Sequence, residues 1–251
     1  MVYKPNEILV LLDDGHGWEV KYGYKTTPKF DDGSFIIENT FNHATKELLK
    51  QSLIEQGFNV FDVSPERTDT KLELRPARAN EQMKAGKYKA YIFISIHFNS
   101  IGLYWDDGVG GIETYHYPGS VEGTKLAKAV HEMLLKGTDL KDRGVKEANL
   151  CVLRETDMPA ILLECGFMSN HTEANLMRNI AYQQECATEV TMGVCNYFGI
   201  TYSKPVDELE RLTKIISPQY SPVWLKHFRA NAKYNWVGFM ESALMKTYTK
   251  P

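Results

Sequence analysis

The stretch Ile8-Leu9-Val10-Leu11-Leu12-Asp13-Asp14-Gly15-His16-Gly17 decides the fold that we predict for this chain. Its first five residues form a continuous apolar run with the length of a strand that is buried on both faces. The run stops at two acids and two glycines, so a histidine stands at the strand end. Glycine on each side lets the backbone turn sharply and leaves the imidazole uncrowded, which suits a metal ligand or a catalytic group. A lone histidine here is more often a surface residue, so its role depends on partners elsewhere.

The composition is that of an ordinary globular protein. The chain has 251 residues, of which 43% are hydrophobic and 24% charged, and its formal net charge is -3. This length fits one large domain, or one domain with an appendage. Because there is no global basic field, we expect no nucleic-acid partner and no attraction to acidic membranes.

The chain carries no recognisable targeting segment. Its first residues run directly into the opening strand without the apolar segment and cleavage site of a signal peptide, and no apolar stretch approaches membrane-spanning length. The cysteines lack paired spacing and lie in apolar stretches, which favours buried free thiols: Cys151, Cys165, Cys186 and Cys195. We therefore expect a monomer that is made in the cytoplasm without a signal peptide and does not insert into membranes.

Apolar runs and amphipathic segments alternate along the rest of the chain. After a surface loop, the pattern predicts strands over residues 58–63, 90–97, 109–116, 150–153 and 160–167, and helices over residues 35–56, 72–86, 120–136, 170–175 and 183–198. Residues 142–144 are predicted to be loop. Strands that alternate with helices predict an α/β fold with a central mixed, partly parallel sheet flanked by helices on both faces.

Three reactive side chains stand at the ends of predicted strands: His16, His97 and Glu164. Functional groups in such sheets gather at the carboxyl ends of the strands, so one arrangement brings all three together. Two histidines and a carboxylate with an open fourth position describe a catalytic zinc site. Glu38 is the natural carboxylate ligand, because the helix after the His16 loop can aim its first turn at the strand ends. Glu164 then remains free to take a proton from water and to protonate a leaving nitrogen.

These residues also have ordinary structural explanations. Glu38 can be an acid favoured by the helix dipole. Glu164 can be a buried carboxylate paired with Arg154 or Lys146, and the residues alone weigh this evenly with catalysis. His116 also ends a strand and is a weaker site candidate. The histidines on helices or at a helix start are expected to be surface residues: His43, His131 and His171.

Seven segments, in order along residues 7–199, resemble the zinc-dependent N-acetylmuramoyl-L-alanine amidases of the amidase-3 type. They are Leu11-Leu12-Asp13-Asp14-Gly15-His16-Gly17, Glu38-Asn39-Thr40-Phe41-Asn42, the Leu-x-x-Arg-x-x-x-Ala-Asn pattern of residues 72–80, Phe93-Ile94-Ser95-Ile96-His97-Phe98-Asn99-Ser100, Gly110-Gly111-Ile112-Glu113-Thr114-Tyr115, Asp142-Arg143-Gly144-Val145-Lys146 and residues 159–170. Several ordered motifs that match together are a far more specific signal than any one of them.

The resemblance implies a Zn²⁺ cofactor held by His16, Glu38 and His97, with Glu164 as the catalytic glutamate. It implies peptidoglycan as the substrate and hydrolysis of the amide that joins the lactyl group of N-acetylmuramic acid to L-alanine of the stem peptide. Zinc would polarise the carbonyl and activate water, and Glu164 would pass the proton to the departing amine.

Two residues are predicted to contact the substrate: Arg154 and Asn99. For Arg154, a structural ion pair is an equally good explanation. The chain departs from the usual family pattern at Asp14 and Trp18, which flank the Gly-His-Gly turn, and at Cys165. Asp13 and Asp14 cannot both face inward from an extended chain, so they are not a paired metal site.

Three further points stay open at this level. A muropeptide-binding protein without hydrolytic activity and a zinc peptidase that cleaves elsewhere in the stem peptide are alternative functions. Without a signal peptide, the chain is expected to be a phage or prophage lysin that a holin releases to the cell wall, or an enzyme exported by another route. Residues 201–251, outside the catalytic domain predicted over residues 1–200, form a basic, aromatic helical appendage that either binds cell wall or packs on that domain.

Overall fold

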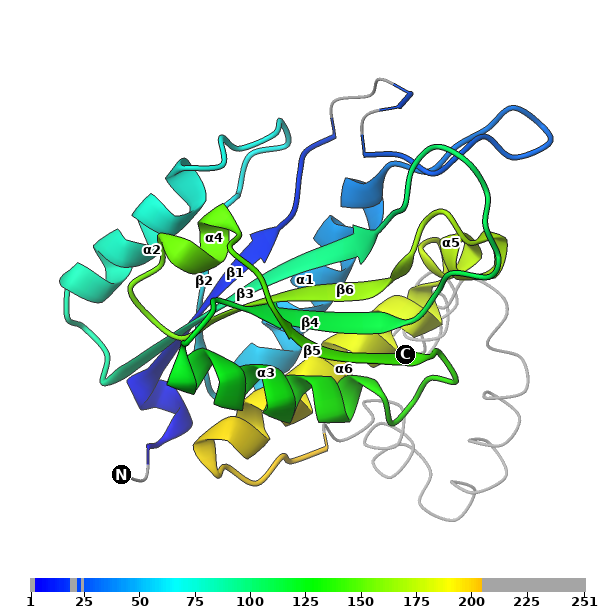
Figure 1. The fold of residues 1–251 in the computed structure, drawn as a ribbon. Helices are drawn as coiled ribbons and strands as arrows, with labels where there is room; N and C mark the ends of the chain where they lie inside the picture. The colour runs from blue at the N-terminus through cyan, green and yellow to red at the C-terminus, as the bar shows by residue number, and fades with distance from the viewer. Residues whose placement is uncertain (1–2, 19–21, 24, 205–251) are drawn as a thin grey trace, which may run out of the picture. The chain divides into compact units, whose positions relative to one another are not determined.

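The computed structural model of the protein describes residues 3–18, 22–23 and 25–204 (Figure 1). Its strands are β1 (Ile8–Asp14), β2 (Asn59–Asp62), β3 (Ala90–Asn99), β4 (Ile112–His116), β5 (Asp142–Glu147) and β6 (Ala160–Phe167). Its helices are α1 (Glu38–Glu55), α2 (Leu74–Lys84), α3 (Val121–Leu134), α4 (Cys151–Arg154), α5 (His171–Leu176) and α6 (Ile180–Phe198), after a 3-10 turn at Pro5–Glu7. None of these helices is long and apolar enough to cross a membrane. Residues 205–251, most of the predicted appendage, lie outside the described residues, so that prediction stays untested.

The six strands form one mixed sheet in the order β2-β1-β3-β6-β4-β5. β1 is parallel to β2 and β3, and β3 is parallel to β6. β4 runs antiparallel to β6, and β5 is parallel to β4. The predicted partly parallel sheet is therefore confirmed, and the carboxyl ends of β1, β3 and β6 meet at one edge.

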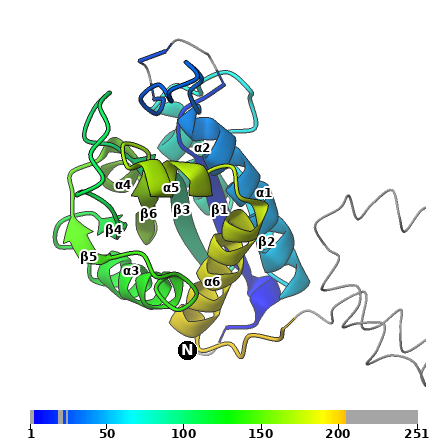
Figure 2. The same cartoon turned by 90° about the vertical axis from the view of Figure 1, so that its right-hand side faces the viewer.

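Alternate residues of the strands face two separate hydrophobic layers. On one face, Ile8, Val10 and Leu12 of β1 pack with the apolar sides of α1, α3 and α6. On the other face, Leu9 and Leu11 pack with smaller apolar groups from α2 and α4. Figures 1 and 2 show these helices on the two sides of the sheet. Burial on both faces at about 1.5–3 kcal/mol per large aliphatic side chain holds the strand ends in fixed positions.

Two local predictions are wrong. Residues 150–153, predicted as a strand, begin helix α4, where the amide of Arg154 donates to the carbonyl of Leu150 at 2.8 Å. Four apolar residues are too few to distinguish the two periodicities, and no strand in the described part of the chain pairs with them. Residues 142–144, predicted as loop, belong to β5. This edge strand is mostly polar and partly exposed, so it has no apolar pattern to reveal it.

Other local predictions agree with the structure. Asn170 caps α5, because its side chain accepts a hydrogen bond from the amide of Glu173 at 3.0 Å. Pro76 lies in the first turn of α2, where its missing amide proton costs no hydrogen bond. All four cysteines are free thiols, and three of them are buried: Cys165, Cys186 and Cys195.

Candidate metal centre and active site

The structure brings together the three residues that the sequence predicts as metal ligands. One donor atom each from His16, Glu38 and His97 lies within 4.8 Å of the others. Nδ1 of His97 is 3.0 Å from Oε1 of Glu38, and Nε2 of His16 is 3.5 Å from Oε2 of the same carboxylate. Glu38 is the first residue of α1 and its side chain is buried, so it serves more than the helix dipole.

His16 is held in an unusual backbone conformation at the end of β1. Its φ angle is 66°, in the left-handed region that costs a non-glycine residue about 1–3 kcal/mol. The turn is fixed because the amide of Gly15 donates to the carbonyl of Ile96 at 3.0 Å. The side-chain amides of Asn39 and Asn42 also donate to the Gly15 carbonyl, at 2.9 and 3.0 Å. The first turn of α1 thus supplies a ligand and the anchors of the neighbouring ligand loop.

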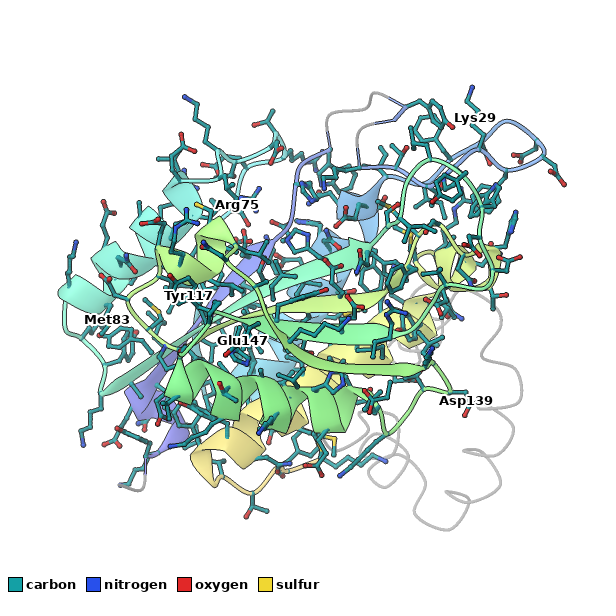
Figure 3. All side chains as sticks on the ribbon, viewed as in Figure 1. Lys29, Arg75, Met83, Tyr117, Asp139 and Glu147 are labelled. Carbon is teal, nitrogen blue, oxygen red and sulfur yellow. The ribbon has the colours of Figure 1, made fainter. Side chains whose placement is uncertain are left out.

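Arg75 of α2 is a second anchor, and its role was not predicted from the sequence (Figure 3). It is almost fully buried and pairs with the carboxylate of Asp13. Its guanidinium also donates to the carbonyls of Asp14 at 2.7 Å and His16 at 3.2 Å, and to Asp69 at 3.0 Å. One cation therefore joins three points of the loop that carries His16. The only available signal was a single arginine on a helix within the amidase-like motifs.

The two adjacent acids of β1 face opposite sides of the sheet, as an extended chain requires. Asp13 points to Arg75, and Ser95 donates to it at 2.6 Å. Asp14 lies 3.0 Å from the ammonium group of Lys46 and 2.8 Å from Nδ1 of His43. Neither acid belongs to the metal-binding cluster, so Asp14, one of the departures from the family pattern, serves a structural ion pair.

The electrostatics of the cluster favour metal binding. Burial, the largest effect, lowers the pKa of His16 to about 4, so its imidazole is neutral at neutral pH. Burial acts to raise the pKa of Glu38, but the hydrogen bond from His97 and the charges of the two histidines hold that pKa below its usual range. A neutral imidazole at His16 and an ionised carboxylate at Glu38 are the protonation states that a metal ion requires of these two groups.

Glu164 of β6 lies beside the cluster because it pairs with His97 in the register of the two parallel strands. Its Oε2 atom is buried and has no hydrogen-bond partner within the described part of the chain. Burial, and next the charges of Glu38 and Glu113, raise its pKa well above the usual range. The ion pairs considered for it are not formed, because Lys146 lies 2.5 Å from Glu113 and Arg154 lies 2.7 Å from Glu155.

Glu113 of β4, which was not predicted as a site residue, lies on the other side of Glu164. The two glutamates are register partners across the antiparallel pair. The buried carboxylate of Glu113 accepts hydrogen bonds from Arg143 at 2.6 Å, Lys146 at 2.5 Å and the side-chain amide of Asn99 at 2.9 Å. Asn99, a predicted substrate contact, is therefore joined to this cluster, and Arg154 is not.

The remaining histidines are outside the metal-binding cluster. His116 is buried on the α3 side of the sheet and lies 3.0 Å from the carbonyl of Tyr117. His131, predicted at the surface, is buried: Nδ1 lies 3.0 Å from Thr114 and Nε2 lies 2.9 Å from Asp142. That prediction is wrong because residue 131 falls on the side of α3 that faces β4 and β5.

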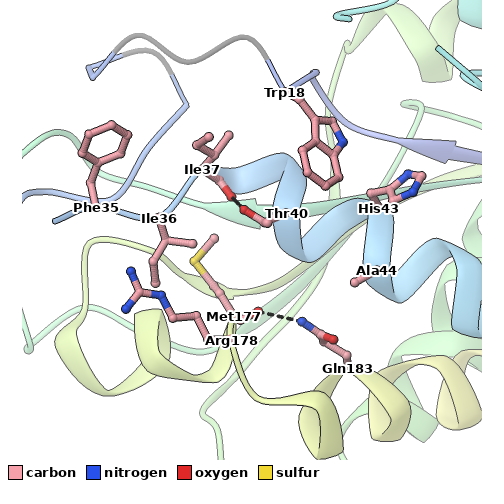
Figure 4. Close-up of a pocket in the computed structure, with 10 residues that line it drawn as sticks. All are labelled: Trp18, Phe35, Ile36, Ile37, Thr40, His43, Ala44, Met177, Arg178 and Gln183. Atoms are coloured by element: carbon pink, nitrogen blue, oxygen red, sulfur yellow. Dashed lines mark hydrogen bonds between the residues drawn. The ribbon is translucent and has the colours of Figure 1, made fainter. Parts of the chain in front are cut away.

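A separate hollow of about 630 Å³ opens beside the first turns of α1 (Figure 4). Its walls come from the His16 loop, the residues before α1, α1 itself, the segment between α5 and α6, and α6: Trp18, Phe35, Ile36, Ile37, Thr40, His43, Ala44, Met177, Arg178 and Gln183. Trp18, the second departure from the family pattern, packs edge-on against His43 with ring centres 5.7 Å apart. The hollow adjoins segments that carry two predicted ligands but contains none of the ligands itself.

His16, His97 and Glu164 at the strand ends of an α/β sheet, with Glu38 at the start of α1, form the candidate metal centre of a hydrolase. The sequence profile of the N-acetylmuramoyl-L-alanine amidase family, Amidase_3, matches residues 10–196. The chain belongs to this family.

Individual relatives agree. N-acetylmuramoyl-L-alanine amidase CwlM of Bacillus licheniformis is 31% identical over 195 residues, which cover 77% of this chain and 70% of that protein. The crystal structure of N-acetylmuramoyl-L-alanine amidase from Clostridium difficile 630 superimposes with a TM-score of 0.67 at 30% identity, covering 77% of this chain and 98% of that one. An endolysin of Bacillus phage SPP1 is 33% identical over 123 residues, 47% of this chain and 44% of that protein.

Proposed function

We propose that this protein is a zinc-dependent N-acetylmuramoyl-L-alanine amidase in which His16, Glu38 and His97 hold the metal and Glu164 moves the proton. Membership of the family establishes a peptidoglycan amidase that cleaves the bond between N-acetylmuramic acid and L-alanine. The identity of the metal and the roles of the individual residues are our proposal.

The observation that carries these roles is the position of Glu164. The buried Oε2 atom of Glu164 has no hydrogen-bond partner among the described residues, which is costly for a carboxylate, and it lies beside three converging donor atoms. Two neutral imidazoles and one carboxylate, with room for further ligands, are the donor set of catalytic zinc. The donor set therefore fits Zn²⁺ better than the hard, oxygen-preferring Mg²⁺ or Ca²⁺.

When bound, Zn²⁺ supplies Lewis acidity that polarises the scissile carbonyl and makes water a better nucleophile at neutral pH. Glu164 takes a proton from the attacking water on its unpaired Oε2 and then gives that proton to the leaving nitrogen of L-alanine. The pKa of Glu164, raised by burial and by the charges of Glu38 and Glu113, suits the second step, because the carboxyl then holds the proton that it gives to the leaving nitrogen. Glu38 and His97, fixed by mutual contact, keep the reacting groups aligned.

The cell wall is the place where such an enzyme acts. The similarity to a phage endolysin supports a lysin, and release through a holin remains part of the proposal. The alternative of a muropeptide binder without activity gives no reason for the unpaired Glu164. The reaction product distinguishes this amidase from the alternative, a zinc peptidase, because only the amidase frees the amino group of L-alanine.

The test combines metal analysis with mass spectrometry of digested muropeptides on the wild type and on Glu164→Gln. We expect one zinc per chain in both, with activity lower by roughly 10²–10⁴-fold in the variant. Glu155→Gln, on an exposed glutamate of the loop after α4, is the matched control and should retain full activity. Full activity of Glu164→Gln, or new amino groups at a position other than L-alanine, would overturn the proposal.

A further inference from the structure

We propose that Arg143 and Lys146 of β5 form an anion subsite that binds a carboxylate of the stem peptide, one residue beyond the scissile amide. This inference rests on the proposed amidase function and adds a determinant of substrate specificity to it. Its ligand is a single carboxylate group, and the two cations are the residues that recognise it.

The cations lie in a row with the reacting groups. His97 pairs with Glu164 between β3 and β6, and Glu164 pairs with Glu113 between β6 and β4. Register partners in neighbouring strands project to the same face, at about 5 Å from each other. Arg143 and Lys146 contact Glu113 from β5, the next strand in the sheet. The cations therefore lie beyond Glu164, on the side away from the metal ligands.

The two cations share one carboxylate in direct contact. Among the described residues, Arg143 and Lys146 both pair with Glu113, while Glu173, the other acid that the charge of Arg143 influences, is held by the backbone amides of Gly111 and Phe167. Glu113 is buried with 2% of its side chain exposed, whereas the side chains of Arg143 and Lys146 are 28% and 37% exposed. The counter-ion is thus hidden below the surface, while both cations can be reached from the active face.

Arg143 also has hydrogen-bond donors that are not used within the described residues. It binds Glu113 through Nε alone, and its two Nη amino groups have no hydrogen-bond acceptor among the residues that the structure describes. Its guanidinium lies over the ring of Phe167 at 4.8 Å, which fixes the plane of the group. A planar, pre-positioned guanidinium with free donors is the side chain that best binds a carboxylate.

The direction of the substrate points to the stem peptide as the ligand. The carbonyl carbon under attack must lie at the metal ligands, and the leaving nitrogen must lie at Glu164, which protonates it. The stem peptide begins at that nitrogen and so continues past Glu164, towards β5. Arg154 is a poorer candidate for this contact, because its guanidinium already pairs with Glu155 and donates a hydrogen bond to the side-chain carbonyl of Asn149.

The test is a double-mutant cycle between enzyme and substrate. Two muramyl peptides are used that differ only at the residue after L-alanine, whose α-carboxyl group is free in one and a carboxamide in the other. On the full-length, zinc-loaded enzyme, Arg143→Gln should raise KM about tenfold for the carboxylate and less than about twofold for the carboxamide, with kcat nearly unchanged. Arg78→Gln, a surface arginine of similar exposure paired with Glu66, is the matched control and should change neither KM.

The outcomes are separable. An equal effect of Arg143→Gln on both peptides would overturn the subsite, since a merely structural role predicts it. If that variant does not fold, as judged by its melting curve, Lys146→Met is read in the same way. Calorimetric binding of both peptides to Glu164→Gln is measured as well. A preference for the carboxylate in that titration, together with a wild-type enzyme that releases no L-alanine amino group, would retain the subsite and reject the proposed reaction. Equal binding of the two peptides would reject the subsite.

Discussion

Gly15 packs directly against the imidazole of His97: a Cβ atom on residue 15 would lie 2.0 Å from Cε1 of that ring. The positive backbone angle of the turn belongs to the next residue, His16. The glycine before the first ligand is therefore required for space more than for turning. The two ligand-bearing strands are close enough that any side chain at residue 15 displaces the second ligand.

We expect Gly15→Ala to weaken zinc binding by at least about tenfold, because His97 must move away from Glu38 to admit the methyl group. Zinc affinity is measured by competition with a chelator. Gly119→Ala is the control: that glycine also has a positive φ, of 76°, but nothing lies within 4 Å of its Cβ position. It should lose about 1 kcal/mol of stability and retain zinc. Equal zinc affinity in Gly15→Ala and the wild type would contradict the steric argument.

Arg75→Met should destabilise the fold by about 3–5 kcal/mol, because it leaves Asp13 buried without a counter-charge. The free energy of unfolding is measured by denaturant titration of the zinc-free protein. The double variant Asp13→Asn with Arg75→Met removes the stranded charge and should recover part of the loss. A double variant that is less stable than Arg75→Met would show that the buried charge is not the cause.

Ser95→Ala should weaken zinc binding by about 10–100-fold with little loss of stability. The hydroxyl of Ser95 donates to Asp13 at 2.6 Å and lies 3.1 Å from Nε2 of His97. Because its proton goes to the carboxylate, the hydroxyl can accept from Nε2–H when Nδ1 of His97 exchanges its contact with Glu38 for a metal ion. Chelator competition measures the affinity. Ser52→Ala, at a buried serine of α1, should leave it unchanged.

Stability should fall between about pH 4.5 and pH 7 in part because of Glu189 on α6. Burial, and next the charge of Glu185, raise the pKa of Glu189 to about 7 from 4.5. The unfolded chain therefore loses this proton first as the pH rises, and ionisation favours unfolding until the folded-state pKa is passed. Glu189→Gln should be more stable than the wild type by about 2 kcal/mol at pH 8 and nearly equal at pH 4. Melting temperatures of the wild type and of Glu189→Gln are measured across this pH range. A variant that melts no higher than the wild type at pH 8 would exclude the effect.

Most residues of the candidate site could be predicted from the sequence. His16, His97 and Glu164 could be placed together because apolar runs identify buried parallel strands, and parallel strands present their carboxyl ends at one edge. Glu38 followed from its place in the first turn of the next helix. The anchors could not be placed: Arg75 reaches Asp13 across 62 positions of sequence, and no local pattern encodes such a contact.

The polar strand at the edge of the sheet could not be predicted from the sequence either. Strand β5 has few apolar residues, since only one neighbour and one partly exposed face constrain it, and so it was mistaken for loop. The ion pairs of Arg143 and Lys146 with Glu113 were missed for the same reason, although all three residues lie within motifs that resemble the family. Their proximity depends on the pairing of β4 with β5, and pairing is a property of the assembled sheet.

The sequence by itself determined the fold class, the family and the residues of the candidate metal-binding cluster, because hydrophobic periodicity and the position of reactive groups at strand ends are local properties. Only the tertiary structure decided which charges are paired and which are left over. Lys146 pairs with Glu113 and Arg154 pairs with Glu155, so neither cation pairs with Glu164. Arg143 keeps free donors beside Glu113. Charge pairing of this kind depends on distances between strands that are far apart in the chain.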